Sequence, residues 1–395
     1  MKPASTKTVR ILGTQGVPAN YGGFETAAEN IGLYMARHGW RVIVYCQISG
    51  SGPITEDTWN GLERVLIPIN PLRYPGWKGT SKFDWLSIKH ACKYHDVCLT
   101  LGYNTGMYNF RQWIKGIPNV INMDGIEWSR KRWGLFKQIV LYVNERFAAF
   151  YGNKLIADHP EIEKYLWTRA PRNKVLTMTY GADPIQDVPA HALAAYGLEV
   201  RKYLTLIARP IPENSILELV KAFSVRPRGQ KLVVFGKYTQ DDLYHRQVME
   251  AASQEVVFPG AIYDKEVVQA IRFHATGYLH GHTVGGTNPS LVEAMAAGNA
   301  VIAHGNPYNR WVAQGGALYF GNTQDADGQI TRLLHEEGLP ERLSAASLAR
   351  FAEEFTWDQV AGQYEQLLSQ YVACEAYVTS PGRDVWTREE GITVQ

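Results

Sequence analysis

The stretch GHTVGGTNPSLVEAMAAG, residues 281–298, joins a turn of small residues to a well-patterned helix. Asn288 is suited to the helix N-cap and Pro289 to the first helical turn. Backbone N–H groups at such a helix start have no partner within the helix, and the helix dipole favours an anion beside them. An ordinary capped helix after a tight loop would show the same pattern. The alternative is a cradle for a phosphate-bearing ligand.

Strand-like segments alternate with helical ones in two successive halves of the chain. In the first half, strands are expected in TVRILGTQG, RVIVYCQ, DVCLTLG, NVINMDG, NKLIADH and KVLTMTYG. In the second half, they are expected in YLTLIAR, KLVVFG, EVVFPGAI, ATGYLHG, AVIAHG and ALYF. This alternation is typical of parallel sheets with crossover helices.

The pattern pauses between Tyr180 and Asp187, which is typical of a hinge. We therefore expect an N-terminal domain over 1–185 and a second domain over 186–356. A C-terminal helix and tail over 357–395 should pack back toward the N-terminal domain. Both domains would be Rossmann-like α/β units with parallel sheets facing a central cleft, where ligands bind beyond the carboxyl ends of the strands.

Composition narrows the classes of function. Of 395 residues, 45% are apolar and 20% charged, and the net charge is +2, which argues against a dedicated nucleic-acid binder. The four cysteines show no Cys-x-x-Cys spacing, which favours reduced thiols in the cytoplasm and no zinc site. No signal peptide or membrane span is expected, so any membrane contact would be peripheral, from the cytoplasmic side.

Three features of the second half follow strands and would meet at one edge of a parallel sheet. Arg209 follows YLTLIA, Lys237 follows KLVVFG, and the helix start at 285–291 follows ATGYLHG. An arginine guanidinium is suited to phosphate oxygens. Glu293, one turn into the helix, is placed to accept hydrogen bonds from a ribose. Together they predict a nucleoside diphosphate site, although each alone is more often structural.

The second half resembles the nucleotide-sugar-binding half of glycosyltransferase family 4. The segments that carry this resemblance are ARPIPENSILELVKAF, VVFG, GAIYD, YLHGHTVGGTNPSLVEAMAAGNAVIA and GGALYF. In the first half, GTQGVPANYGGFET, NMDGIEWSRKRW and YGAD are similar to a bacterial subgroup identified as rhamnosyltransferases. The resemblance runs to about Tyr371 and implies a retaining enzyme with the GT-B fold.

The chain departs from the family's acidic pattern. The family has two glutamates with seven residues between them; Glu293 matches the second, but Gly285 stands at the first. In the family that first glutamate helps to hold the donor sugar. Recognition of the sugar would then fall to His282, Thr287, Asn288 or backbone N–H groups. The implied donors are deoxysugar nucleotides such as dTDP-L-rhamnose.

A second departure concerns positive charge. Arg209 matches the family's phosphate-binding arginine, but Asn214 stands where a lysine is expected. Lys237 or Arg310 would supply the second charge. The expected donor-binding residues are Gly22, Gly23, Arg209, Asn214, Lys237, His282, Gly285, Gly286, Thr287, Asn288, Ser290, Leu291 and Glu293.

A glycine-dense loop, residues 13–26, follows the first strand. A dinucleotide site is the alternative interpretation, but the glycines do not give Gly-x-Gly-x-x-Gly, and RVIVYCQ ends in Gln47 rather than an acid. In the transferase interpretation this loop, with Gly22 and Gly23, reaches across the cleft toward the donor phosphates and the acceptor.

Asp124 ends a strand that faces the cleft, and Glu127 lies beside it. These are the expected catalytic residues, because a carboxylate there could accept the acceptor's proton or stabilise positive charge on the sugar ring. Helix capping by Asp124 is the structural alternative. In family 4, retention is usually attributed to front-face attack, in which the leaving phosphate helps to take the proton. The aspartates at 241–242 are expected to cap a helix, and the histidines at 280 and 282 to pack or contact the donor, so no metal or cofactor is expected.

The stretch WSRKRWGLFKQIVLYVNERF, residues 128–147, has a broad apolar face and four basic residues, Arg130, Lys131, Arg132 and Lys137. It is interpreted either as a core helix with a charged start or as a surface that docks on the cytoplasmic leaflet. Residues 70–85 add aromatic and basic side chains to the same half. A lipid-linked acceptor would account for both.

We therefore expect a cytoplasmic, retaining glycosyltransferase of bacterial surface polysaccharide synthesis. It would move a sugar from a nucleotide diphosphate to a glycan or lipid-linked glycan without a metal, and the resemblance implies L-rhamnose. Alternatives are a family 4 enzyme that uses a UDP- or GDP-hexose, and a sugar-nucleotide-binding or scaffold protein with weakened catalysis. Gly285 and Asn214 keep the last alternative open.

Overall fold

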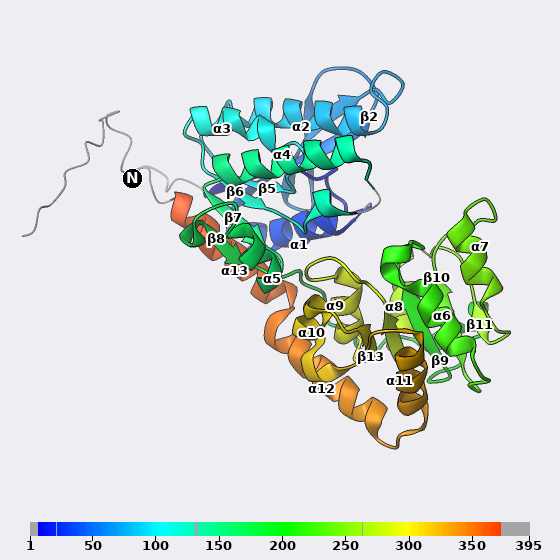
Figure 1. Cartoon of the computed structure of the whole chain (residues 1–395). Coiled ribbons are helices and arrows are strands. Elements are labelled where there is room, and N and C mark those ends of the chain that lie inside the picture. The colour runs from blue at the N-terminus through cyan, green and yellow to red at the C-terminus, as the bar shows by residue number, and fades with distance from the viewer. Residues whose placement is uncertain (1–6, 21, 131–132, 263, 373–395) are drawn as a thin grey trace, which may run out of the picture.

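A computed structural model describes residues 7–20, 22–130, 133–262 and 264–372, and this part of the chain forms two sheets in separate halves (Figure 1). The first sheet has the strand order β3-β4-β2-β1-β5-β6-β7-β8. Its strands are β1 (Thr8–Leu12), β2 (Arg41–Ser49), β3 (Thr55–Trp59), β4 (Leu62–Ile69), β5 (Val97–Leu101), β6 (Asn119–Asn122), β7 (Lys154–Ala157) and β8 (Val175–Thr177). Its described pairings are parallel except β3 with β4. The predicted parallel sheet of the first half is confirmed.

The β3–β4 hairpin is missing from the sequence-based prediction. Asn60, with φ 48°, and Gly61, with φ 85°, form its two-residue turn, and Trp59 pairs with Leu62. Positive φ at both turn positions is the geometry that Asn-Gly favours. Asn60-Gly61 could therefore have predicted the hairpin, but the prediction followed the strand–helix alternation instead.

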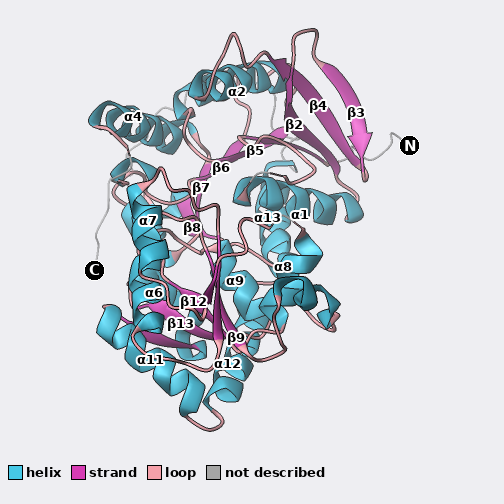
Figure 2. Cartoon of the chain, turned by 90° about the vertical axis from the view of Figure 1, so that its right-hand side faces the viewer, coloured by secondary structure: helices cyan, strands magenta, loops and turns pink. Residues whose placement is uncertain are grey.

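Helices cover both faces of the first sheet (Figure 2). They are α1 (Gly23–Arg37), α2 (Trp77–Ala91), α3 (Phe110–Ile114), α4 (Leu135–Tyr151) and α5 (Pro160–Leu166), with 3₁₀ turns η1 (Gly106–Asn109), η2 (Glu127–Ser129) and η3 (Arg172–Lys174). Ala28, Ile31 and Met35 recur at helical spacing on α1 and are fully buried. Their spacing places one apolar stripe of α1 against the sheet.

The helix expected over residues 128–147 begins later than predicted. η2 occupies 127–129, and α4 begins at Leu135, so Trp128 to Gly134 precede the helix; Lys131 and Arg132 lie outside the described residues. Leu135 and Phe136 are 73% and 80% exposed, so the start of α4 is not a core helix. Among the described helices, none combines the length and apolarity that crossing a membrane requires.

The second sheet has the strand order β11-β10-β9-β12-β13-β14, with parallel pairings throughout its described residues. Its strands are β9 (Tyr203–Ile207), β10 (Lys231–Phe235), β11 (Val256–Val257), β12 (Gly277–His280), β13 (Ala300–His304) and β14 (Ala317–Phe320). The helices of this half are α6 (Ile216–Ser224), α7 (Leu243–Glu250), α8 (Lys265–Phe273), α9 (Pro289–Ala296), α10 (Pro307–Ala313), α11 (Thr323–His335) and α12 (Leu339–Glu354), with 3₁₀ turns η4 (Ala190–Tyr196), η5 (Pro212–Asn214) and η6 (Gln314–Gly316). Buried runs such as Leu204 to Leu206 reflect strands covered on both faces.

The chain passes between the halves at two adjacent points. The Ala182 N–H donates to the Phe355 carbonyl over 2.8 Å, and the Trp357 N–H donates to the Ala182 carbonyl over 3.3 Å. A Cβ at Gly181 would lie 2.7 Å from the Trp357 ring, so glycine permits this close approach. The two crossings are thus held together by backbone hydrogen bonds.

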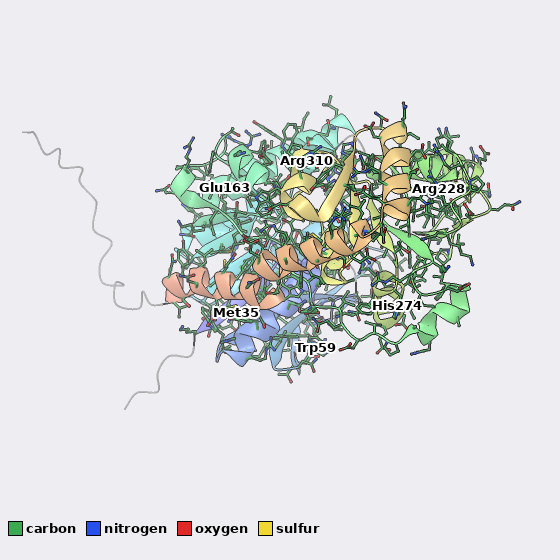
Figure 3. The ribbon with its side chains drawn as sticks, turned by 90° about the horizontal axis from the view of Figure 1, so that it is seen from below. Met35, Trp59, Glu163, Arg228, His274 and Arg310 are labelled. Carbon is green, nitrogen blue, oxygen red and sulfur yellow. The ribbon has the colours of Figure 1, made fainter. Side chains whose placement is uncertain are left out.

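After the second crossing, α13 (Trp357–Val372) returns along the first half. Its buried residues Val360 and Tyr364 belong to the same apolar core as Met35 on α1, which Figure 3 shows beside this helix. The Tyr364 hydroxyl accepts a 2.8 Å hydrogen bond from the Asn122 side-chain amide at the end of β6. The last described helix is therefore part of the N-terminal core.

Candidate active site

A cavity of about 1360 Å³ lies between the two halves. It is lined by loops that follow β1, β6 and β7 on one side and β9, β10 and β12 on the other. The predicted site residues that line it are Gly22, Gly23, Asp124, Glu127, Arg209, Asn214, Lys237, His282, Gly285, Gly286, Thr287, Asn288 and Ser290. Leu291 and Glu293 lie outside this lining. The structure thus brings most of the predicted residues to one place.

The start of α9 faces this cavity. The Asn288 side-chain oxygen accepts from the Ser290 N–H over 3.1 Å and from the Ser290 hydroxyl over 2.8 Å, so Asn288 is the predicted N-cap. Pro289 occupies the first turn. The N-terminus of α9 is the positive end of the helix dipole. Because it faces the cavity, the arrangement favours an anion there.

Positive side chains enter the cavity from both halves. Arg209 and Lys237 are exposed on the side of the second sheet, and Arg130 lines the opposite side. Arg310, the other candidate for a second charge, instead donates to the Gly305 carbonyl over 2.9 Å and lies outside the described cavity lining. Lys237 is therefore the better placed of the two.

Asn214 has a positioning role rather than a charge. Its side-chain amide donates a 2.8 Å hydrogen bond to the Arg209 carbonyl, and only 5% of the residue is exposed. A Cβ at Gly281 would lie 2.1 Å from the Asn214 carbonyl, so the loops after β9 and β12 are in close contact. Asn214 thereby fixes the backbone from which the Arg209 side chain extends.

Leu291 and Glu293 lie outside the cavity lining and have partners within the second half. Leu291 is fully buried in an apolar cluster, and its N–H donates to the Asn288 carbonyl over 3.1 Å. Glu293 forms a 2.9 Å ion pair with Arg272 on α8. The ribose contact expected of Glu293 stays a prediction.

The glycine-dense loop of the first half is folded around Glu25. This carboxylate accepts from the Thr14 hydroxyl over 3.1 Å and from the Gln15 N–H over 2.8 Å. A Cβ on Gly23, at the start of α1, would lie 3.7 Å from the Pro289 side chain. The N-termini of α1 and α9 therefore approach each other across the cavity. Sequence reasoning overlooked Glu25, although an acid on the first helical turn after a glycine loop was visible.

Asp124 and Glu127 both line the cavity but differ in surroundings. Asp124 has φ 52°, and its N–H donates to the Asn122 side chain over 2.9 Å. Ile126 rather than Asp124 is the N-cap of η2, so Asp124 does not cap this turn. Glu127 forms a 2.6 Å ion pair with Arg130 and accepts from the Trp133 ring N–H over 2.9 Å. Glu127 thus positions the guanidinium of Arg130, which lines the cavity opposite Arg209 and Lys237.

Asp158, directly after β7, is a cavity residue that sequence reasoning missed. The same argument from strand ends that selected Asp124 would have found it. Burial raises the pKa of Asp158 to about 7, and the negative charge of Asp124 raises it further, while hydrogen bonds from backbone N–H groups and the charge of Arg130 act against this shift. Asp158 therefore exchanges its proton near neutral pH.

Two stacked histidines lie where β12 meets the loop 281–288, which we call the donor loop after its expected role. The His280 and His282 rings are 4.4 Å apart at 13°. Burial lowers the pKa of His282 to about 4, aided by Arg130 and Arg209, so the ring is neutral at physiological pH. Asp242 caps α7, as predicted. Among the described residues, no group of three or more histidine, cysteine or acidic side chains is arranged to hold a metal.

Apolar side chains line the cavity on both halves. On the second half they include Ala208, Phe235, Ile262 and Val268. On the first half they include Trp77 on α2, Tyr108 on η1, and Phe136 and Val140 on α4. This apolar lining was not predicted, because the residues come from elements far apart in the sequence.

The comparisons with known proteins are consistent with this architecture. A family model described as a domain of unknown function (DUF1972) matches residues 6–183. No curated protein matches the chain. Among solved structures, sucrose-phosphate synthase from Thermosynechococcus elongatus has a TM-score of 0.78 at 18% identity, covering 93% of this chain and 100% of that chain.

Two further structures are similar over nearly the whole chain. HepE from Anabaena in complex with UDP has a TM-score of 0.71 at 13% identity, covering 92% of this chain and 100% of that chain. An α,α-trehalose 6-phosphate synthase from Burkholderia multivorans has a TM-score of 0.71 at 11% identity, covering 96% and 100%. With two sheets of mainly parallel strands that face one cavity, these likenesses show that the chain has the GT-B fold.

Proposed function

We propose that this protein is a retaining glycosyltransferase that moves a sugar from a nucleotide diphosphate to a glycan or lipid-linked glycan acceptor. One observation carries the proposal: the N-terminus of α9, Arg209 and Lys237 face the N-terminus of α1 and Arg130 across a single cavity. Two helix starts and three cations around one space form a site for a diphosphate.

The reaction breaks the bond between the sugar's anomeric carbon and the diphosphate oxygen. Arg209, Lys237 and the start of α9 stabilise the negative charge that develops on the leaving diphosphate. The acceptor oxygen forms the new bond on the same face, and its proton passes to the departing phosphate oxygen. Asp124 stabilises the positive charge on the sugar ring, and Glu127 positions Arg130. With these cations, the reaction needs no metal.

The donor we favour is dTDP-L-rhamnose, because Gly285 removes an acidic side chain from the sugar pocket. The alternative is a UDP- or GDP-hexose. HepE has been solved in complex with UDP-glucose, and a trehalose-6-phosphate synthase from E. coli with UDP-2-fluoro glucose. Both complexes are of proteins with a similar fold, so UDP-glucose is the first alternative donor to test.

We further propose that the acceptor is lipid-linked and that the enzyme works at the inner face of the membrane in surface polysaccharide synthesis. α2, α3 and α4 lie together on the outer side of the first half (Figure 1). Their large exposed apolar residues are Trp77, Trp113, Ile114, Leu135, Phe136, Ile139, Val140, Tyr142, Val143 and Phe150. Trp77, Phe136 and Val140 also line the cavity, so this apolar surface continues into the site.

The charges of these helices suit an anionic lipid surface. Lys78, Lys89 and Arg146 are exposed, whereas the acids Asp84 and Glu145 are buried. Basic and aromatic residues on one face favour binding to anionic lipid. Co-sedimentation with vesicles tests this: binding to vesicles that contain phosphatidylglycerol, lost at high salt and in Phe136→Ser, supports the proposal. Equal recovery with neutral and anionic vesicles contradicts it.

A thermal-shift panel with UDP, GDP, dTDP and ADP, followed by their sugar nucleotides, tests the proposed function. One nucleoside diphosphate should stabilise the protein more than the others, and release of free sugar from the matching sugar nucleotide should follow. Binding without any release or transfer would favour the other class, a sugar-nucleotide-binding or scaffold protein. A protein stabilised by none of them would not be a glycosyltransferase of this kind.

A further inference from the structure

Acidic side chains are unevenly distributed around the cavity. Its lining includes five acids, Glu25, Asp84, Asp124, Glu127 and Asp158, and all of them come from the first half. The second half contributes cations and neutral groups, with no acid in the described lining. Any carboxylate that contacts a ligand held by the second half must therefore reach across from the first.

Asp158 differs from its neighbours in hydrogen bonding. Glu25, Asp84 and Glu127 each accept hydrogen bonds from nearby side chains of the protein. Backbone N–H groups, including that of Thr287, donate to the Asp158 carboxyl, but its enclosed Oδ1 atom has no hydrogen-bond partner among the described residues. Asp158 also lines the cavity, so its carboxyl is placed to accept a hydrogen bond from a ligand there.

The Asp158 carboxyl lies directly on the donor loop. A Cβ at Gly286 would lie 1.9 Å from its Oδ1, so only a glycine leaves room for the carboxyl there. The Thr287 hydroxyl donates to the Asp158 backbone carbonyl, which ties the end of β7 to the same loop. Next to Gly286, Gly285 has no side chain, and nothing lies within 4 Å of its ideal Cβ position.

We propose that Asp158 binds hydroxyl groups of the donor sugar, across the cleft from the domain that holds the nucleotide. This inference rests on the proposed function, because it requires a sugar nucleotide in the cavity. Asp158 would supply from the first half the acidic contact that the second half lacks at Gly285. It is a sugar-binding residue, not a ligand of the phosphates.

The charges around Asp158 support a neutral hydroxyl as its partner. Asp124 lies close enough to raise its pKa, and Arg130 opposes that effect. A phosphate would add a third negative group beside two carboxyls, whereas a sugar hydroxyl donates a hydrogen bond without adding charge. Hydroxyl groups are also what every hexose or deoxyhexose donor offers. Arg209 and Lys237, from the opposite side, remain available to the diphosphate.

Calorimetric titration of Asp158→Asn tests the proposal. The probes are UDP with UDP-glucose and dTDP with dTDP-L-rhamnose, using the pair that the parent binds. We expect the affinity for the bare diphosphate to stay within about twofold, and that for the sugar nucleotide to fall about tenfold or more. Asp358→Asn on α13, whose side chain is 84% exposed, is the control and should change neither.

The outcomes separate the inference from the function on which it rests. If the parent binds no nucleotide, the proposed function fails. If the parent binds both ligands, two results contradict the inference: Asp158→Asn loses affinity for both ligands alike, or it loses affinity for neither. In either case Asp158 does not bind the sugar. A purely structural role predicts that both affinities fall alike or that neither falls, because Asp158→Asn keeps the bond from the Thr287 hydroxyl to the backbone carbonyl and alters only the side chain that the Thr287 N–H contacts. Asp158→Ser repeats the test should the asparagine variant not fold.

Discussion

Arg272 on α8 and Glu293 on α9 form a 2.9 Å ion pair behind the donor loop, in which the arginine side chain is 4% exposed and the glutamate 36% exposed. The pair joins two helices of the second half. Because Arg272 is nearly buried, its charge depends on Glu293 for compensation. A substitution at Glu293 therefore tests stability before it tests any contact with a nucleotide.

Glu293→Ala should lower the free energy of unfolding by about 2 kcal/mol, the scale of a lost hydrogen bond between charged groups. Glu293→Gln should lower it less, because the amide oxygen still accepts from the Arg272 guanidinium. Urea unfolding measures both. If Glu293 also holds the ribose, nucleoside diphosphate binding should weaken by roughly 1–3 kcal/mol at temperatures where the variants are folded. Unchanged binding would remove Glu293 from the site.

Arg209 should be the most sensitive cation of the site. Arg209→Ala should strongly reduce turnover while the fold survives, since the residue is exposed and its backbone is held by Asn214. Arg209→Lys should restore turnover partly, because a point charge cannot make two parallel contacts with a phosphate. Steady-state kinetics of the two variants decides this. Full activity in the lysine variant would contradict a bidentate role.

Much of the architecture was predictable because it follows from local patterns. The alternation of strands and helices predicts two parallel sheets. Asn288, as a helix N-cap, and Pro289, as a first-turn residue, predict where α9 begins. The same kind of local signal was available and overlooked at Asn60-Gly61. Glu127 and Arg130 also stand at i and i+3, a spacing that allows the observed pair.

Other features depend on contacts that no local pattern encodes. Glu293 looked free for a ribose because its partner, Arg272, lies on a different helix. The apolar lining of the cavity includes Trp77 on α2 and Phe136 on α4, which are distant in sequence. Asp158 could be placed at a strand end from the sequence, but its contact with Gly286 appears only when the two halves face each other.

The stability of this protein should fall as pH rises from about 5 to 8, in part through Asp84. Burial raises the pKa of Asp84 to about 7, opposed by the Thr105 hydroxyl, against an ordinary value of 3.8. The folded state therefore binds this proton more tightly than the unfolded state, and its contribution is lost as pH rises toward 7.

Thermal unfolding at pH 5 and pH 8 checks this expectation. The difference in Tm between the two pH values should shrink in Asp84→Asn, which cannot ionise. Asp57→Asn is the control and should leave the difference unchanged, because Arg64 lowers the pKa of Asp57 below 3.8 and this carboxyl is ionised in the folded and unfolded states at both pH values. An unchanged difference in Asp84→Asn would mean that Asp84 is ionised at little cost.

Turnover should persist in EDTA. The proposed mechanism offsets the charge of the leaving diphosphate with Arg209, Lys237 and the start of α9, so it needs no divalent ion. The assay is transfer or donor hydrolysis after extensive dialysis against chelator. Loss of activity that magnesium or manganese restores would overturn the metal-independent mechanism.

The final prediction concerns Gly285. Its φ of 121° lies where side chains are strained, at a cost of roughly 1–3 kcal/mol, although the space around its Cβ position is open. Gly285→Glu adds this strain together with a charge beside the sugar pocket, whereas Gly285→Ala adds the strain alone. We expect both variants to retain binding of the bare diphosphate, and the glutamate variant to lose turnover of the native donor well beyond the alanine variant. The comparison of the two isolates the carboxylate, because the backbone cost is shared. Equal turnover in both would mean that position 285 does not face the sugar.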